Sequence, residues 1–400
     1  MFNPYNILIT LSVLIVLSYI FNIIASRLKI PSVILLLATG IGLNYAGKEL
    51  GFVFPDTKIL LELLGITGLI FIVLEGSLDL KLNRQKMPLV GKSLVSALLI
   101  LLATAGIICF ILMEFLALPL RNAVVYAVPL GVISSAIAIP SVAKLHPEKR
   151  EFIIYESTFS DIIGIMVFNY VVLDNVKSAD SVIGFFVDLA IIIGVSLIST
   201  AFLLLVLNYT RSHVKFYLIF AIIILVYSVS KVFHLPSLLL VLIFGLMLNN
   251  ASLYIKGRLA RFLHLERLEP VTRELKLITA ETAFIIRTFF FLLFGFSINL
   301  MLLNDEDVLL IGSLIIVTIL FTRYLFLRFI SHSNLFPGLF VAPRGLITIV
   351  LFYSIPLHLQ SPLFNEGILL FVIIVSSILM MLGLISTKTE YKEQMDDLST

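Results

Sequence analysis

Apolar windows, each about the length of a membrane-spanning helix, alternate along the chain with short polar connections. A helix needs about 20 predominantly apolar residues to cross the hydrocarbon core of a bilayer. We place such windows near residues 6–26, 31–46, 58–78, 88–115, 122–143, 152–173, 182–207, 214–233, 236–249, 281–303, 308–330, 339–357 and 365–386. The pattern therefore predicts an all-α membrane protein with about 13 transmembrane helices.

Composition supports this reading. Of the 400 residues, 60% are hydrophobic and 13% are charged, against about 25% charged in a typical soluble domain. The single cysteine, Cys109, lies in an apolar run, which excludes a disulfide framework and a multi-cysteine metal site. No basic residue precedes Arg27, so the N-terminus is predicted to be a retained first span and not a signal peptide.

Lysine and arginine alternate between the connections, with 19 on one side and 5 on the other. Basic residues gather in cytoplasmic connections, so we expect an external N-terminus and a cytoplasmic C-terminus in a cell (inner or plasma) membrane. The basic stretch from Asn250 to Lys276 carries Leu and Phe between its charges, which favours an amphipathic linker on the anionic leaflet over a regulatory ligand site. Residues 1–386 are expected to form the transmembrane domain, and residues 387–400 a short cytoplasmic tail.

Two carboxylates interrupt the predicted span at residues 152–173, namely Glu156 and Asp161. A charged side chain near the centre of a bilayer costs about 2.5 kcal/mol or more, so its default reading is a functional site. Helical spacing places Ser157 and Asp161 on one face, and Glu156 and Ser160 on the adjacent face. A buried arginine would keep one carboxylate ionised, whereas desolvation disfavours the charged form of an unpaired one, which can then exchange a proton for a cation.

The other reading of these charges is a static salt-bridge network that holds helices together. A static network does not need an additional unpaired acid with hydroxyl groups beside it. Elsewhere in the predicted spans, Arg287 and Asp188 either extend to the membrane surface or pair structurally.

Two predicted spans look like interrupted helices, because proline, glycine and serine gather inside them. The first contains Pro129, Gly131, Ser134, Ser135 and Pro140, and the second contains Pro343, Arg344 and Gly345. Paired broken helices in the two halves of a transporter indicate an ion site near the membrane midplane. We therefore expect two inverted six-helix repeats, at residues 6–173 and 214–386, joined by a linking helix at residues 182–207, with the broken helices crossing near the midplane.

At these residues the chain resembles the cation/proton antiporter superfamily, specifically its sodium/proton exchanger branch. The branch carries Glu-Ser-x-x-Asn-Asp in its sixth span, and this chain has Glu156, Ser157, Ser160 and Asp161 in that register. Similar stretches are GLIFIVLEG at 68–76 with Glu75, TFFFLLFGFSINL at 288–300, LFTRYLFLRF at 321–330 and PRGLITIVLF at 343–352. The resemblance covers essentially the whole chain in order.

The resemblance implies a monovalent cation:proton antiporter, most simply for Na⁺, without a cofactor, working by alternating access as a homodimer in pH homeostasis. It implies that Asp161 binds Na⁺ or the proton in turn, that Glu156 pairs with Arg323, and that Arg344 steadies the broken helix or tunes the pH response. Ser157 and Ser160 belong to the implied ion site, and Glu75, Ser134 and Ser135 are accessory.

Two positions depart from the family pattern. The family's Thr-Asp before Pro140 is replaced by Ala138 and Ile139, so Ser134, Ser135 or backbone carbonyls would have to supply the missing oxygens. Ser160 stands where exchangers have Asn, and one titrating carboxylate predicts electroneutral exchange. A K⁺/H⁺ antiporter or another proton-coupled transporter is the alternative. A channel is less favoured because no filter-like carbonyl run is evident, and the six histidines show no spacing typical of an intramembrane enzyme.

Overall fold

The structure is a computed structural model that describes residues 4–28, 31–49, 58–80, 84–142, 145–172, 187, 190–191, 194–202, 215–232, 237–251, 265–330 and 336–386. These ranges are helical and contain no β-strand. Most of the predicted linking helix at 182–207, the connection at 252–264 and the tail at 387–400 lie outside the described residues.

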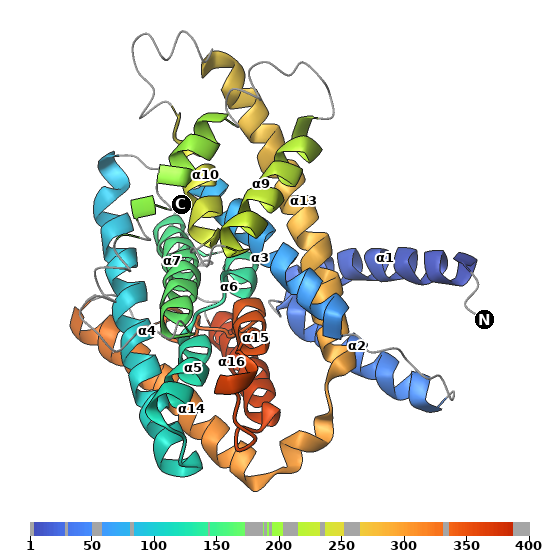
Figure 1. The fold of residues 1–400 in the computed structure, drawn as a ribbon. Coiled ribbons are helices and arrows are strands. Elements are labelled where there is room, and N and C mark those ends of the chain that lie inside the picture. The colour runs from blue at the N-terminus through green and yellow to red at the C-terminus, as the bar shows by residue number, and fades with distance from the viewer. Residues whose placement is uncertain are drawn as a thin grey trace, which may run out of the picture.

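The helices follow the predicted windows in order along the chain (Figure 1). Their bounds are α1 Pro4–Leu28, α2 Ser32–Glu49, α3 Lys58–Asp79, α4 Met87–Leu116, α5 Leu120–Gly131, α6 Ser135–Ser141, α7 Pro147–Val172, α9 Lys215–Val232, α10 Ser237–Asn249, α13 Leu265–Ser297, α14 Glu306–Leu325, α15 Leu346–Tyr353 and α16 Glu366–Ser386. Short 3₁₀ turns cover Arg84–Lys86, Leu300–Asn304 and Leu357–Leu359, and a π-helical turn, Phe326–Ile330, continues α14.

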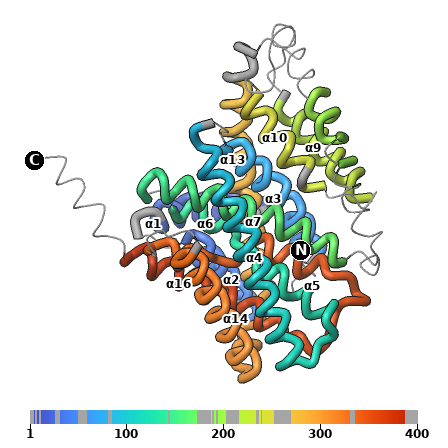
Figure 2. The backbone as a smooth tube through the Cα atoms, turned by 90° about the vertical axis from the view of Figure 1, so that its left-hand side faces the viewer, coloured from blue at the N-terminus to red at the C-terminus, as the bar shows by residue number. Residues whose placement is uncertain are grey.

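The helices form two groups of mutual contacts. In the first, here called the α13 bundle, α13 packs on α2 and α3, while α10 contacts α3 and α9, and α1 contacts α2. In the second, the α7 bundle, α4 packs on α5, α7 and α14, α6 packs on α7, and α16 packs on α14. Figure 2 shows α9 and α10 together at one end and α14 beside α16 at the other. Helix α15 lies between the bundles, because it contacts α3 as well as α5 and α7.

Glycine allows the closest approach inside the α13 bundle. A Cβ atom on Gly40 of α2 would overlap the carbonyl oxygen of Leu292, and one on Gly295 of α13 would overlap the backbone of Leu37. Small residues at such crossings let helix backbones pack closely in lipid, where van der Waals contact replaces the hydrophobic driving force. Helices α2 and α13 are therefore held together through backbone contact.

Six helices in the described ranges are long and apolar enough to cross a membrane, namely Ile59–Asp79, Met87–Leu116, Leu120–Ser141, Pro270–Ser297, Glu306–Phe329 and Glu366–Ser386. Shorter apolar helices cover Ser12–Ala25, Phe216–Val232 and Leu240–Asn249. Helix α7 is outside this set although apolar residues dominate it, since it carries Glu156 and Asp161 in addition to the charges of its first turns. The chain is thus a multi-pass membrane protein whose regular secondary structure, over the described residues, is helical throughout.

Two predicted spans have different boundaries in the structure. Helix α13 begins at Leu265, well before the predicted start at residue 281, because the Leu and Phe spacing of the basic stretch continues as helix toward Pro270 and beyond. That part of the stretch is not a separate surface linker. The window at 339–357 is helical only over Leu346–Tyr353, since residues 336–340 form turns and residues 341–345 have no regular secondary structure.

The two non-helical segments meet. Helix α5 ends at Gly131 and α6 begins at Ser135, so residues 132–134 separate them. The N–H of Ser134 donates to the carbonyl of Pro343 at 2.9 Å, which joins this segment to the non-helical residues before α15. The chain thus places two unwound segments side by side, next to α7.

Candidate ion-binding site

Helix α7 carries the site's acids into the protein interior. The side chains of Glu156 and Asp161 belong to residues that are 1% and 2% exposed, and Ser157 and Ser160 are equally buried. A buried charge must be paired or solvated by polar groups, so the partners of each carboxylate decide its chemistry. The two carboxylates have different partners.

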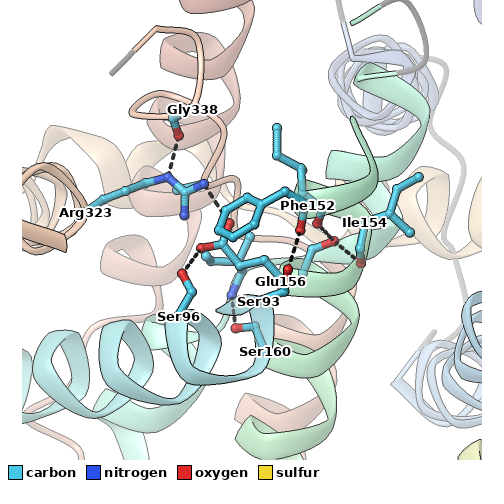
Figure 3. Close-up of polar contacts among 12 residues, drawn as sticks. Ser93, Ser96, Phe152, Ile154, Glu156, Ser160, Arg323 and Gly338 are labelled. Atoms are coloured by element: carbon cyan, nitrogen blue, oxygen red, sulfur yellow. Dashed lines mark hydrogen bonds and ion pairs between the residues drawn. The ribbon is translucent and has the colours of Figure 1, made fainter. Parts of the chain in front are cut away.

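Glu156 is surrounded by donors from two other helices (Figure 3). Arg323 of α14 donates from Nη2 to Glu156 Oε2 at 2.8 Å, and its side chain is 1% exposed. The hydroxyl of Ser96 on α4 donates to Oε1 of the same carboxylate. Arg323 also donates from Nε to the carbonyl of Gly338. This carboxylate is compensated in charge and satisfied at both oxygens.

Asp161 has neutral partners. The N–H of Ser135 donates to Asp161 Oδ2 at 3.2 Å. The other oxygen, Oδ1, is buried and has no hydrogen-bond partner among the described residues. The N–H of Ile133 donates to Ser160 Oγ at 2.9 Å. Helix α7 thus holds the unwound turn before α6 at two points, and Asp161 is left with one oxygen available to a ligand.

Two more buried hydroxyl groups lie on α7 and on the turn before α6. Ser157 Oγ donates to the carbonyl of Ile153 at 2.8 Å, which leaves its lone pairs able to accept or to bind a cation. Ser134 Oγ is buried and has no partner among the described residues. A Cβ atom on Gly345 would lie 2.8 Å from that hydroxyl, so the segment before α15 passes directly over Ser134. The Ser134 hydroxyl is therefore enclosed where the two unwound segments meet.

Arg344 is fully buried, and backbone carbonyls surround its charge. Its guanidinium donates from Nε to Leu130 O at 2.8 Å, from Nη2 to Gly131 O at 3.1 Å and from Nη1 to Ala342 O at 2.6 Å. The first two carbonyls end α5, where a helix presents unpaired acceptors and partial negative charge. The N–H of Arg344 donates to Ser376 Oγ on α16 at 3.1 Å. Arg344 therefore fastens the second unwound segment to the end of α5.

Glu75 does not reach Asp161 directly. It lies on α3 in the α13 bundle, where its Oε2 accepts from Arg287 Nη2 at 3.2 Å. Arg287 also donates from Nη1 to the carbonyl of Ala136 on α6, at 2.9 Å. Of the two readings for Arg287, structural pairing is the one observed.

The predicted site residues lie mainly on α7, on the turn before α6 and the start of α6, on α14, and on the segment before α15. Sequence reasoning missed Ser96 and Ser376, which bind Glu156 and the backbone of Arg344. The signal for Ser96 was a polar residue inside an apolar span, one turn beyond Ser93. In the described ranges no group of three or more His, Cys, Asp or Glu side chains could hold a metal ion.

A helical bundle with two unwound segments and a buried carboxylate that has no counter-ion among its described hydrogen-bond partners is typical of membrane transporters of ions. The family model for the transmembrane domain of sodium/hydrogen exchangers matches residues 12–387, and the chain belongs to that family. This confirms the resemblance drawn from the motifs.

Solved structures agree on the fold. The structure at pH 8 of the sodium proton antiporter MjNhaP1 from Methanocaldococcus jannaschii has a TM-score of 0.68 at 21% identity, covering 96% of this chain and 99% of that one. An electron-microscopy structure of the same antiporter has a TM-score of 0.67 at 20% identity, covering 96% and 95%. No curated protein sequence matches the chain.

Proposed function

We propose that the protein exchanges Na⁺ for H⁺ across the membrane, with Asp161 as the group that binds each in turn. The observation that supports this most is the environment of Asp161, which is 2% exposed and has one carboxylate oxygen without a donor among the described residues. A cation or a proton can fill that position, and a single carboxylate cannot hold both. Competition for Asp161 then couples the two fluxes.

The remaining ligands are neutral oxygens. Hydroxyl groups are available from Ser157 and Ser160, which share α7 with Asp161, from Ser134 in the unwound turn and from Ser135 at the start of α6. Hard cations prefer oxygen ligands, and a Na⁺ ion in a buried site requires several of them. In this proposal Asp161 supplies the charge, and hydroxyls, carbonyls and water complete the shell.

The charge balance favours electroneutral exchange. Glu156 is neutralised by Arg323 at 2.8 Å and stays out of the cycle, so one carboxylate accepts one cation or one proton. Purified protein reconstituted in liposomes should then exchange ions at a rate that is independent of membrane voltage. A transport current that reverses with voltage would contradict this stoichiometry.

The transport assay is fluorescence dequenching in proteoliposomes with Na⁺, K⁺ or Li⁺, on the parent and on Asp161→Asn. We expect Asp161→Asn to abolish exchange of every cation, since an amide neither releases a proton nor offers a negative charge. Asp79→Asn is the matched control, because Asp79 is a partly exposed carboxylate that pairs with Lys276 on the other bundle. Wild-type rates from Asp161→Asn would overturn the proposal, and a preference for K⁺ would favour the K⁺/H⁺ alternative.

On a larger scale we propose alternating access through movement of the α7 bundle against the α13 bundle, within two inverted repeats at residues 6–173 and 214–386. Contacts between the bundles are sparse compared with those inside them, which supports such a movement. We also propose a homodimer that serves pH homeostasis in a cell membrane. The mass of the protein in detergent tests the dimer, and growth of a deletion strain at alkaline pH in high sodium tests the physiological role.

A further inference from the structure

Arg287 on α13 connects the two bundles beside the ion site. Its Nη1 donates to the carbonyl of Ala136 on α6 at 2.9 Å, and its Nη2 contacts Glu75 Oε2 on α3 at 3.2 Å. The Arg287 side chain is 12% exposed and that of Glu75 is 26% exposed. We propose that Arg287, held by Glu75, is a positioning residue for the ion site, because it supplies α6 with a hydrogen-bond donor that this helix lacks.

Pro140 is the reason that α6 lacks the donor. An α-helix bonds each carbonyl to the N–H four residues later, and proline has no N–H. Pro140 lies inside α6, so the carbonyl of Ala136, four residues earlier, has no donor from position 140. Burying an unsatisfied carbonyl is costly, and the Arg287 guanidinium takes the place of the missing N–H.

The position of Ala136 makes this contact relevant to ion binding. Ala136 follows Ser135, whose N–H donates to Asp161 Oδ2. A shift of the first turn of α6 would move this donor away from the carboxylate. Arg287 thus acts on Asp161 through the backbone of α6 and does not touch the ion, since a guanidinium offers donors and no acceptor.

Glu75 fixes the direction in which Arg287 points. The ion pair lies between α3 and α13, where a second pair, Lys276 with Asp79 at 2.5 Å, joins the same two helices without contacting α6. Neutralising Glu75 would free the guanidinium to turn toward water and leave Ala136. The two acids on α3 therefore differ in a testable way, because only the Glu75 pair extends to the α7 bundle among the described contacts.

The inference rests on the proposed exchange at Asp161, and a double-mutant cycle between Arg287→Gln and Pro140→Ala tests it. Pro140→Ala returns an N–H that can bond the carbonyl of Ala136, so it should relieve the loss of Arg287. In proteoliposomes we expect Arg287→Gln alone to raise the half-saturating Na⁺ concentration about tenfold, the scale of a lost charged hydrogen bond. With Pro140→Ala present, we expect a rise of about threefold or less.

The alternative explanation is that Arg287 acts only through its charge. A charge effect does not depend on the residue at position 140, so equal changes with and without Pro140→Ala would overturn the inference. Asp79→Asn in the same cycle is the control, and its effect should be additive with that of Pro140→Ala. If Arg287→Gln does not fold, Glu75→Gln replaces it in the cycle with Pro140→Ala. This variant keeps the Arg287 guanidinium, so we expect a smaller change in the half-saturating Na⁺ concentration.

The same cycle measured as melting temperature in detergent does not involve transport. Non-additive melting temperatures would support the bond from Arg287 to the Ala136 carbonyl even if the parent transports no Na⁺, a result that would contradict only the proposed function. Additive melting temperatures together with additive Na⁺ dependence would contradict the positioning role of Arg287 and leave the role of Asp161 intact.

Discussion

Glu156 and Asp161 lie less than two turns apart on α7, and their neighbours give them different tasks. Arg323 donates to one oxygen of Glu156 and Ser96 to the other, whereas for Asp161 the N–H of Ser135 donates to one oxygen only. A buried ion pair is balanced against the cost of taking both charges out of water. Removing one member leaves that cost on the other, so the Glu156 pair is expected to act mainly on stability.

Glu156→Gln should destabilise the protein by about 3 kcal/mol, because the buried Arg323 guanidinium loses its counter-ion. The measurement is thermal unfolding of the purified protein in detergent. Asp79→Asn breaks an ion pair whose side chains are 28% and 45% exposed, so it should cost less than about 1 kcal/mol. Equal melting temperatures for the parent and Glu156→Gln would argue against a stabilising role for the buried pair.

The partner of a buried side chain can be predicted from sequence only where few residues could be that partner. A buried acid needs a cation, and few arginines lie within predicted spans, so a buried arginine could be expected beside one carboxylate. The resemblance to the exchanger family then singled out the pair Glu156 and Arg323. The hydroxyls of Ser96 and Ser376 could not, because serine is common in membrane helices and its partners depend on tertiary packing. The contact of Arg287 with the Ala136 carbonyl could not be predicted either, since every residue has a backbone carbonyl and the sequence does not show which one is a partner.

At the scale of elements, the crossing of the two unwound segments depends on Gly345. A Cβ atom there would lie 2.8 Å from Ser134 Oγ and 2.5 Å from Ile137 Cδ1. Gly345→Ala should therefore push α6 and the segment before α15 apart, at a cost of about 1 to 3 kcal/mol typical of overpacking, and should lower the Na⁺/H⁺ exchange rate. Melting temperature and proteoliposome flux measure the two effects.

The control for Gly345→Ala is a glycine with open space. A Cβ atom on Gly106 of α4 meets nothing within 4 Å. Gly106→Ala should raise stability by up to about 1 kcal/mol through helix propensity and leave the exchange rate unchanged. If Gly345→Ala also raised stability and left the exchange rate unchanged, the close contact at the crossing would not be needed for transport.

Helix boundaries show where sequence patterns stop being sufficient. The apolar windows located α4, α14 and α16 to within a few residues, because their ends coincide with polar connections. The start of α13 was missed, since an amphipathic helix entering the membrane has charges that resemble those of a connection. The short extent of α15 was also missed, because Pro343 and Gly345 mark a break without giving its length.

At the scale of the whole molecule, the positive-inside pattern predicts which connections face the cytoplasm. A cysteine at Leu357, which is 85% exposed between α15 and α16, should react with a membrane-impermeant maleimide in intact cells. A cysteine at Gln85, before α4, should react only after permeabilisation. Both variants carry Cys109→Ala, which removes the buried native thiol. The reverse labelling pattern would invert the proposed topology.

The grouping of helices into two bundles could not be obtained from the windows themselves. Every span is apolar over much of its surface, so lipid-facing and protein-facing sides look alike in composition. Gly40 and Gly295 allow the close contact between α2 and α13, yet a glycine in a membrane helix does not indicate which helix packs against it. Inverted repeats suggested a symmetric plan, while the assignment of each helix to a bundle required coordinates.

The hydrogen bond from Ser134 N–H to the carbonyl of Pro343 has a consequence for amide hydrogen exchange. Ser134 lies outside any helix, so its amide proton is protected by this contact between chain segments more than 200 residues apart. Deuterium uptake at this amide would therefore record separation of the two unwound segments, while the helical amides of α5 on one side stay protected. A peptide covering residues 132–135 thus gives a local measure of the opening of the ion site in the unmodified protein.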